Sequence, residues 1–333
     1  MLDYLKISFA GLISLLTEFI LHLTKPLCGY IRKMNKFKYW GYGLKIASQI
    51  EFPELLPANF TTPDVTIEVV DELKEIEGKK NTIGDRSYTI NQKELLFEQK
   101  HIARYLASGG NRVLMQPVPG TNEIAMVRLV LLTSVLAAIL LQKRRLPIHA
   151  SAILKDGKLT LIAGDSGTGK STSLAGLINN GHTLFSDDVV AVNQDFMTFA
   201  SYPMMKLWDD TQQKLNSDLF NDKSYLIKSG VKKYGIFFHD SFITECFPIS
   251  KFIILKKAHA GQLVSIELTG ADKFSAIQAQ VYRQLFIQDV ELRKLCFEVV
   301  SYLSNTCTVY EITRPEVCDH NDLIREVESL LLI

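Results

Sequence analysis

A run of eight residues near the middle of the chain constrains its fold more than any other feature. Gly164–Ser171 reads Gly-Asp-Ser-Gly-Thr-Gly-Lys-Ser and fits the phosphate-loop pattern G-x-x-x-x-G-K-[ST]. The backbone N–H groups of such a loop form a concave site for anions, and the N-terminus of the following helix adds the positive end of its dipole. Lys170 can reach the β- and γ-phosphates of a nucleotide, and the Ser171 hydroxyl can ligate Mg²⁺. The alternative is a glycine turn that enters a helix, with Lys170 in solvent.

The residues on either side of the loop agree with a phosphate-binding role. Leu159–Ala163 is apolar and predicts a strand that enters the loop, and it forms a hairpin with Ala152–Leu154. Lys170–Asn179 predicts the helix that follows, with Asn180-Gly181 as its C-terminal stop. The sequence therefore predicts a strand, loop and helix in the order that phosphate binding requires.

Two adjacent carboxylates follow the next apolar strand, Thr183–Phe185. Asp187 and Asp188 lie 17 and 18 residues after Lys170. Carboxylates at a strand end beside a phosphate loop suit a Mg²⁺ ligand or a proton acceptor, and the alternative is a polar loop. His149 precedes the hairpin, where a lone histidine beside apolar residues is more typical of a core position.

The string from His149 to Val190 resembles the HPr kinase/phosphorylase superfamily, whose phosphate-loop domain is related to that of phosphoenolpyruvate carboxykinase. The matching residues are an H-A-S-A entry at His149–Ala152, the loop itself, and a G-H-x-L-x-x-D-D-V stretch at Gly181–Val189. The separations between these three motifs also match. A looser similarity to HPr-kinase-like proteins found near peptide-modification genes extends to the segments Tyr42–Ser48, Pro53–Leu55, Tyr202-Pro203 and Lys206–Asp210.

The resemblance implies a fold, a reaction and a set of site residues. The fold is an α/β phosphate-loop kinase core of the HPr kinase and phosphoenolpyruvate carboxykinase type, behind a small β-rich domain. The reaction is ATP- and Mg²⁺-dependent transfer of the γ-phosphoryl group to a serine of a peptide or small protein, such as a ribosomally made lasso-type precursor. The implied nucleotide-binding residues are Gly164, Asp165, Ser166, Gly167, Thr168, Gly169, Lys170, Ser171 and Thr172.

The resemblance also implies the role of each catalytic group. Asp187 takes the proton of the substrate serine, Lys170 neutralises developing charge, and His149 sits near the transferred phosphoryl group. Ser171 binds Mg²⁺, and Asp188 assists the metal or the phosphate site.

One family element is missing. The HPr-acting enzymes carry an acidic-x-Arg-Gly-Leu-Gly stretch downstream of the aspartate pair, and no such stretch occurs here. Asp209 and Asp210 are the nearest acidic candidates. The departure argues against HPr as the substrate and against a phosphorylase reaction. It also weakens the inference, from hexameric HPr-type relatives, that the chain forms a homo-oligomer.

Two other functions stay open at the level of sequence. A kinase of a small-molecule hydroxyl would differ only in its acceptor pocket, which the sequence does not reveal. A nucleotide-binding regulatory module without turnover is the second alternative. The chain has neither the N-K-x-D element of GTPase switches nor the Leu-Ser-Gly-Gly element of ABC-type ATPases.

Changes in composition and hydrophobic pattern along the chain predict three parts. Residues 1–36 are expected to form an appended helical, amphipathic segment, residues 37–122 a small, mainly β domain, and residues 123–333 the phosphate-loop catalytic domain. The expected strands of the β domain include Thr66–Val70, Ser87–Ile90 and Arg112–Met115. In the third part we expect a buried helix at Glu123–Gln142, a strand pair at Phe252–Leu255 and Leu263–Ile266, and helices at Lys273–Leu303 and Asn321–Leu331.

Charge and cysteine content limit the classes of partner and the cellular compartment that we expect for this protein. The net charge of +1 gives no reason to expect nucleic acid, although residues 1–50 carry +5 and the rest −4. Five widely spaced cysteines without a C-x-x-C motif suit a reducing cytoplasm. The family resemblance implies that this cytoplasm is bacterial. The 17-residue apolar stretch Ile7–Leu23 contains Glu18 and His22 and is short for a membrane span. It predicts a helix that lies on a membrane, docks on a partner or packs within the chain.

Overall fold

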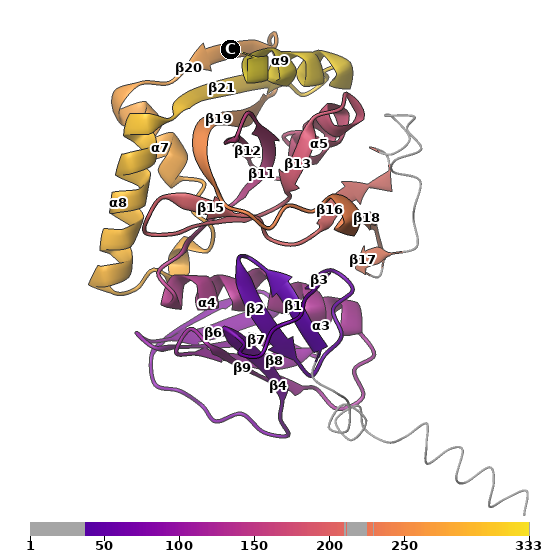
Figure 1. Ribbon diagram of the computed structural model, residues 1–333, viewed down its shortest axis with the longest axis vertical. Coiled ribbons are helices and arrows are strands. Elements are labelled where there is room, and N and C mark those ends of the chain that lie inside the picture. The colour runs from indigo at the N-terminus through magenta and orange to yellow at the C-terminus, as the bar shows by residue number, and fades with distance from the viewer. Residues whose placement is uncertain (1–36, 210, 212–224, 229, 333) are drawn as a thin grey trace, which may run out of the picture.

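The computed structural model describes residues 37–209, 211, 225–228 and 230–332 (Figure 1). The expected helix at residues 1–36, its membrane or partner contact, and Asp210 lie outside the described residues. In Figure 1 the chain forms a lower β-rich region and an upper region of mixed strands and helices, with a helical segment between them. The fold is therefore of the mixed α/β class, with two large sheets.

The lower region is one nine-stranded sheet with the order β3-β1-β2-β4-β9-β8-β7-β6-β5. Most neighbouring strands are antiparallel hairpin partners, and β4 (Val65–Val69) shows the alternation of buried and half-buried residues that a sheet with one covered face requires. The three strands predicted for this region are confirmed. The strands besides β4 are β1 (Phe37–Gly41), β2 (Leu44–Ser48), β3 (Leu56–Pro57), β5 (Lys79–Ile83), β6 (Arg86–Ile90), β7 (Glu94–Gln99), β8 (Ala103–Ser108) and β9 (Arg112–Pro117).

A buried helical segment separates the two sheets. The sequence predicts one helix at Glu123–Gln142, whereas the structure divides it into α3 (Ile124–Val130), a π-helical turn η1 (Leu131–Val135) and α4 (Leu136–Gln142). Apolar periodicity does not distinguish i→i+4 from i→i+5 hydrogen bonding over one turn, so the π-helical turn has no sequence signal.

The segment is long and apolar enough to cross a membrane, but 67% of its most apolar window is buried inside the protein. Tyr42 and Tyr105 of the lower sheet also donate hydroxyl hydrogen bonds to helix carbonyls at Leu132 and Val127, at 2.8 and 3.4 Å. The expected buried core helix is therefore confirmed, and tyrosines from the sheet hold it in place.

The upper region is a second nine-stranded sheet, in which a path β10-β14-β15-β19-β12-β11-β13 continues from β19 to β21 and β20. The predicted strand pair at 252–255 and 263–266 is wrong. Both strands exist, but β21 lies between them, parallel to β19 and antiparallel to β20. The strands are β10 (Leu146–Ile148), β11 (Ala150–Lys155), β12 (Lys158–Gly164), β13 (Thr183–Ser186), β14 (Val190–Val192), β15 (Met197–Phe199), β19 (Phe247–Ala258), β20 (Val264–Glu267) and β21 (Thr308–Pro315).

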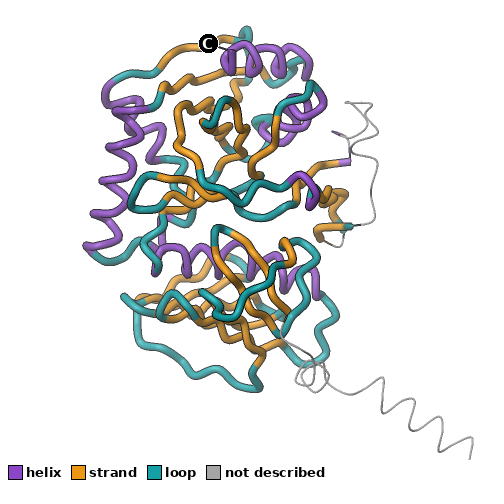
Figure 2. Tube along the Cα trace, in the orientation of Figure 1, coloured by secondary structure: helices purple, strands orange, loops and turns teal. Residues whose placement is uncertain are grey.

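Helices cover this sheet on both sides (Figure 2). The predicted helix α5 (Lys170–Asn179) is confirmed and packs with α9 (His320–Leu332), where Gly176 leaves room for Ile324. The expected helix at Lys273–Leu303 is divided into α7 (Gly270–Gln278), a 3₁₀ turn η4 (Gln284–Phe286) and α8 (Val290–Thr306). Arg283, with a left-handed φ of +55°, makes the break between α7 and α8.

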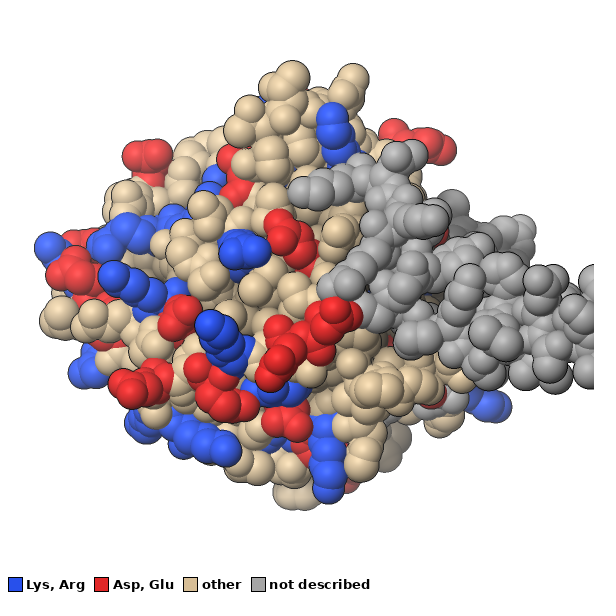
Figure 3. Space-filling view, turned by 90° about the horizontal axis from the view of Figure 1, so that it is seen from below, with Lys and Arg blue, Asp and Glu red and all other residues tan. Residues whose placement is uncertain are grey.

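A small third sheet, β16-β18-β17, stands beside the second. Its strands are β16 (Met204–Trp208), β17 (Leu226–Lys228) and β18 (Val231–Phe237), and a 3₁₀ turn η3 (His239–Ser241) follows them. On the end of the molecule that Figure 3 shows, basic and acidic side chains are interspersed, in keeping with the small net charge.

The strand directions bring distant residues to one edge of the second sheet. β11 is antiparallel to both β12 and β13, so it begins where these two strands end. β12, β19 and β21 are parallel and therefore end at the same edge. This edge collects His149, the glycine loop, Asp187 and the end of β21, and ligands of open α/β sheets bind at such carboxyl ends.

Candidate functional site

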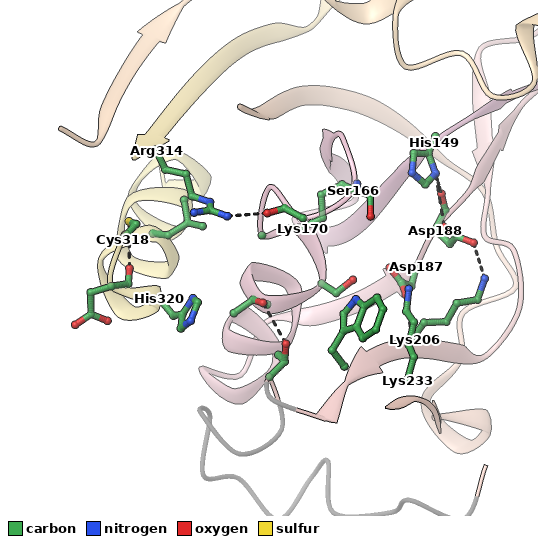
Figure 4. Close-up of a pocket in the computed structure, with 18 residues that line it drawn as sticks. His149, Ser166, Lys170, Asp187, Asp188, Lys206, Lys233, Arg314, Cys318 and His320 are labelled. Carbon is green, nitrogen blue, oxygen red and sulfur yellow. Dashed lines mark hydrogen bonds and ion pairs between the residues drawn. The ribbon is translucent and has the colours of Figure 1, made fainter. Parts of the chain in front are cut away.

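A cavity of about 570 Å³ lies at this edge, within the size range of small-molecule sites (Figure 4). The glycine loop forms its floor, the start of α9 and the end of β21 form one wall, and the small third sheet forms the opposite wall. Among the described lining residues, four Lys and Arg side chains outnumber three aspartates. The lining residues are His149, Ser166, Gly167, Gly169, Lys170, Ser171, Thr172, Asp187, Asp188, Lys206, Trp208, Thr211, Lys233, Arg314, Cys318, Asp319, His320 and Leu323.

Glycine is required where the loop leaves β12 and where it enters α5. Gly164 has a φ of +132°, and a Cβ there would come within 2.2 Å of the Leu255 carbonyl oxygen. Gly169 has a φ of +111°, and a Cβ there would come within 2.7 Å of Leu323. These two glycines let the backbone turn tightly between the strand and the helix. Gly167, with a φ of +83°, has open space where a Cβ would be, so the loop leaves room for a ligand close to its backbone.

Arg314, at the end of β21, lines the cavity and holds the loop through its carbonyl groups. Its Nε donates to the carbonyl of Thr168 at 2.6 Å and its Nη2 to the carbonyl of Gly167 at 2.7 Å. Nη1 donates to the carbonyls of Pro315 and Glu316 at 3.0 and 3.3 Å. The guanidinium therefore ties two loop carbonyls to β21.

Lys170 lies across the loop at the start of α5. Its Nζ donates to the Gly164 carbonyl and, at 3.1 Å, to the Asp165 carbonyl. Burial lowers the pKa of Lys170, while Asp188, Asp187 and Asp165 act in the opposite direction. An ammonium group that is partly desolvated and faces carbonyl dipoles gains from an added anion, so phosphate oxygens are suitable partners for it.

A local turn directs both aspartates into the cavity. Successive residues of an extended strand point to opposite faces, which would separate Asp187 from Asp188. Asp188 instead adopts a left-handed φ of +71°, which aspartate tolerates better than most residues, and the Val189 N–H donates to the Asp187 carbonyl at 2.9 Å. Both side chains consequently line the cavity.

Asp187 is fixed by two uncharged donors. Its Oδ1 accepts from the Ser151 hydroxyl at 2.7 Å, and its Oδ2 accepts from the Lys206 backbone N–H at 2.9 Å. The residue is buried, with 4% of its surface exposed. The carboxylate is thus held in one orientation without a direct cation.

Asp188 forms an ion pair with Lys206, whose Nζ lies 2.5 Å from its Oδ2. Burial raises the pKa of Asp188, but Lys206, His149 and Lys233 together lower it by more, so the pKa lies well below its ordinary value. Burial lowers the pKa of Lys206, but Asp188 holds it well above the ordinary value. Both groups therefore stay charged at neutral pH.

His149 contacts the same turn. Its Nδ1 lies 2.8 Å from the Asp188 carbonyl oxygen, which can only accept, so Nδ1 carries a proton. The ring stacks on Tyr282 at 5.7 Å, and its backbone N–H donates to the Gln280 carbonyl at 2.8 Å. His149 is therefore oriented by three contacts, and in the neutral ring Nε2 is the acceptor.

The donors at the cavity suit a magnesium ion that arrives with a nucleotide. No group of three His, Cys, Asp or Glu side chains within the described part of the chain has metal-site geometry. Mg²⁺ needs few protein ligands because waters and phosphate oxygens complete its shell. Ser171 and Asp188 would hold it, since Oδ1 of Asp188 is 3.6 Å from His149 Nδ1 and therefore has no hydrogen bond to that nitrogen.

The structure brings most of the expected site residues to one cavity. His149, Lys170, Ser171, Thr172, Asp187 and Asp188 all line it, together with Ser166, Gly167 and Gly169 of the loop. Gly164, Asp165 and Thr168 contribute backbone carbonyls that bind Lys170 and Arg314.

Three of the cavity residues that were not predicted as site residues carry a positive charge. Lys206 does carry a signal, because a lysine inside the apolar strand Met204–Trp208 needs a buried anionic partner. Lys233 belongs to a charged stretch that could contact a peptide or phosphate, although a charged loop is the simpler interpretation, and Arg314 lies at the end of an apolar strand with no motif. Only the sheet order brings these last two residues to the loop.

His182 has a structural role, as its place before a strand predicts. Its Nε2 lies 2.7 Å from Glu328 Oε1, and Asn180 donates to Glu328 Oε2 at 2.9 Å. These contacts fasten the end of α5 to α9.

Solved structures include chains with a distant likeness to this one. No family model matches the chain, and no curated protein matches it. The structure of the Hpr(Ser) kinase/phosphatase from Coxiella burnetii aligns over 56% of this chain and 87% of its own, at 19% identity and a TM-score of 0.29. A TM-score this low does not establish a common fold.

Proposed function

We propose that this chain is an ATP- and Mg²⁺-dependent phosphotransferase that phosphorylates a serine hydroxyl of a peptide or small protein. One observation carries the proposal: a glycine loop of phosphate-binding sequence, its lysine, two aspartates and an oriented histidine line a single cavity. Phosphoryl transfer needs positioning and charge stabilisation more than covalent chemistry, and these groups provide both.

Each group has a role that its contacts support. Bound Mg²⁺ would neutralise phosphate charge, with Ser171 and Asp188 as its protein ligands. Asp187 is the better proton acceptor of the two aspartates, because its hydrogen-bond donors are uncharged whereas Lys206 depresses the pKa of Asp188. Lys170 stabilises charge on the phosphoryl group from the loop side, and His149 presents Nε2 near the acceptor.

The acceptor is proposed as a peptide, including a ribosomally made precursor of the lasso type, in a bacterial cytoplasm. The support is the sequence similarity to HPr-kinase-like proteins, together with an acceptor wall that exposes Trp208 and carries the half-buried Lys233. Trp208 has 45% of its surface exposed, which is unusual for a tryptophan that only fills a core.

A transfer assay with γ-labelled ATP and Mg²⁺ tests the proposal. The full chain is compared with Lys170→Ala and Asp187→Asn on serine peptides and on HPr. Matched controls are Lys158→Ala, at the exposed first position of β12, and Asp156→Asn, at an exposed position of the turn between β11 and β12. We expect label on a peptide serine and a loss of at least about 100-fold in both site variants, as for removal of one catalytic group.

Other results would contradict the proposal in distinct ways. Label in a metabolite instead of a peptide would indicate a small-molecule kinase. Tight ATP binding with no transfer to any acceptor would favour a regulatory module without turnover. Equal loss in the control variants would show that the site substitutions act through folding.

A further inference from the structure

The small third sheet presents one chemically distinct face to the cavity. In β16, Lys206 and Trp208 are two residues apart and so point to the same side. In β18, Lys233 is the register partner of Trp208 and shares that side. All three side chains line the cavity, and Lys233 Nζ lies 5.4 Å from the centroid of the Trp208 ring. The sheet therefore brings two lysines to the wall opposite the start of α9 (Figure 4).

The two lysines differ in what they contact. Lys206 is committed to Asp188 through the ion pair at 2.5 Å and is 6% exposed. For Lys233, the described residues supply the face of Trp208 but no carboxylate within ion-pair distance. Lys233 is half-buried, so its ammonium is partly removed from water without a compensating anion among the described groups. A desolvated cation at a cavity wall favours an anionic ligand.

The electrostatic neighbours of Lys233 locate that ligand. Burial lowers the pKa of Lys233, Lys206 lowers it further, and Asp188 and Asp187 oppose both effects. Lys233 also contributes to the lowered pKa of Lys170, after burial. Lys233 is thus within electrostatic range of the loop lysine and of both aspartates. Lys233, Lys170 and both aspartates also line the same cavity, so one ligand can contact them together.

We propose that Lys233 is a second phosphate-binding lysine of this cavity, which touches the transferred phosphoryl group from the acceptor side while Lys170 touches it from the loop side. This inference rests on the proposed phosphotransferase function. In the reaction, the serine oxygen bonds to the γ-phosphorus, and the bond from that phosphorus to the β–γ bridging oxygen breaks. The serine proton passes to Asp187 and ADP leaves. The charge on the three non-bridging oxygens is then shared between two lysines from opposite walls.

The proposal is specific to the γ-phosphoryl group, so ATP and ADP distinguish it. Lys233→Gln should weaken binding of ATP about tenfold and leave binding of ADP within twofold, measured by calorimetry on the full chain with Mg²⁺. The turnover number for peptide phosphorylation should fall by about 100-fold, the usual effect of removing one donor to transition-state charge. Lys233→Arg should restore part of the preference for ATP, because it retains the charge.

Lys232→Gln is the matched control. Lys232 is the neighbouring residue of β18, is exposed and points to the opposite face. The control removes the same charge from the same strand and should change neither ATP affinity nor turnover. Far-ultraviolet circular dichroism and thermal unfolding of all three variants show whether the fold is kept.

Three results would overturn the assignment. Equal behaviour of Lys233→Gln and Lys232→Gln would remove Lys233 from the reaction. A raised KM for the peptide with unchanged ATP affinity and turnover number would place Lys233 on an anionic group of the acceptor instead. Equal loss of ATP and ADP affinity would place it on the inner phosphates. If the wild-type chain binds no ATP, the proposed function itself fails, which is distinct from a failure of Lys233 alone.

Discussion

Two buried ion pairs lie in different regions of the molecule. They have similar chemistry but differ in the exposure of the carboxylate. Arg128 Nε lies 2.9 Å from Glu54 Oε1, with side-chain exposures of 12% and 3%. Lys206 Nζ lies 2.5 Å from Asp188 Oδ2, with side-chain exposures of 7% and 27%. Each pair therefore has one partner that is almost fully enclosed, but only the second leaves its carboxylate open to a cavity.

The first pair is closed on all sides. Arg128 also donates to the Tyr225 hydroxyl at 3.0 Å, and that hydroxyl donates to Glu54. Glu54 lies in the loop before β3, Arg128 lies in α3, and Tyr225 directly precedes β17. The three residues therefore join the lower sheet, the central helix and the small third sheet. The second pair joins only β16 to the turn after β13. The cation is buried in both pairs, so it does not distinguish them. The pairs differ in the exposure of the carboxylate, which faces a cavity only in the second pair.

The largest expected effect concerns the closed pair. Arg128→Met leaves the Glu54 carboxylate buried without its cation, which should lower the free energy of unfolding by about 3–5 kcal/mol. Chemical denaturation of the wild type and the variant measures this loss. The double variant Arg128→Met with Glu54→Gln should recover part of it, because no buried charge remains. A loss below about 1 kcal/mol would contradict the structural role.

The open pair should respond mainly in activity. Lys206→Met removes the partner of Asp188, and phosphotransfer should fall by about 100-fold. The loss of stability should be smaller than for Arg128→Met, since the Asp188 carboxylate can reach water through the cavity. Parallel rate and denaturation measurements test the contrast. Two variants with the same ratio of activity loss to stability loss would erase the distinction between the pairs.

A smaller effect is expected at Arg314, which binds the glycine loop and belongs to neither ion pair. Arg314→Gln removes donors to the Thr168 and Gly167 carbonyls, so the loop should lose its preset shape. We expect ATP and ADP affinities to fall together by about tenfold, equivalent to about 1.4 kcal/mol. Calorimetry with both nucleotides checks this, and Arg325→Gln, at an exposed position on α9, is the control. A loss confined to ATP would show that Arg314 contacts the γ-phosphate directly.

The smallest effect is in the pH dependence of stability. Because the cations around Asp188, Lys206 first among them, together outweigh burial and depress its pKa, the contribution of Asp188 is fully present above its unfolded pKa of about 3.9. That contribution is lost as the pH falls through the lower, folded-state pKa. The stability difference between the wild type and Asp188→Asn should therefore shrink as the pH falls below about 4. A difference that stays constant there would contradict the ion pair.

Much of the local structure of the site could be predicted from the sequence. The strand, loop and helix around Gly164–Ser171 depend on glycine conformations, a strand-to-helix pattern and an Asn-Gly stop, all of which act over short distances. The hairpin before the loop is equally local. The aspartate pair could be recognised as a candidate because acidic residues at the end of an apolar strand have few structural uses. These features can be recognised from short stretches of sequence, without knowledge of the segments that pack against them.

Errors appeared where pairing depends on distant segments. The strands at 252–255 and 263–266 are close in sequence and were therefore predicted to pair. In the structure β21, some forty residues further along the chain, lies between them. The division of the helix at 124–142 by a π-helical turn was likewise invisible, because every residue of η1 except Thr133 is buried and the apolar pattern continues through it.

The strand, the glycine loop and the helix that carry Lys170 and Ser171, and the two aspartates that follow, could therefore be predicted from sequence. Their neighbours depend on the tertiary structure. Parallel alignment of β12, β19 and β21 places Arg314 against the loop, and pairing of β16 with β18 places Lys206 and Lys233 beside Asp188 and Trp208. The physical reason is that backbone conformation and charge type are properties of single residues. Burial, ion pairing and the walls of a cavity exist only after strands distant in sequence have been ordered in one sheet.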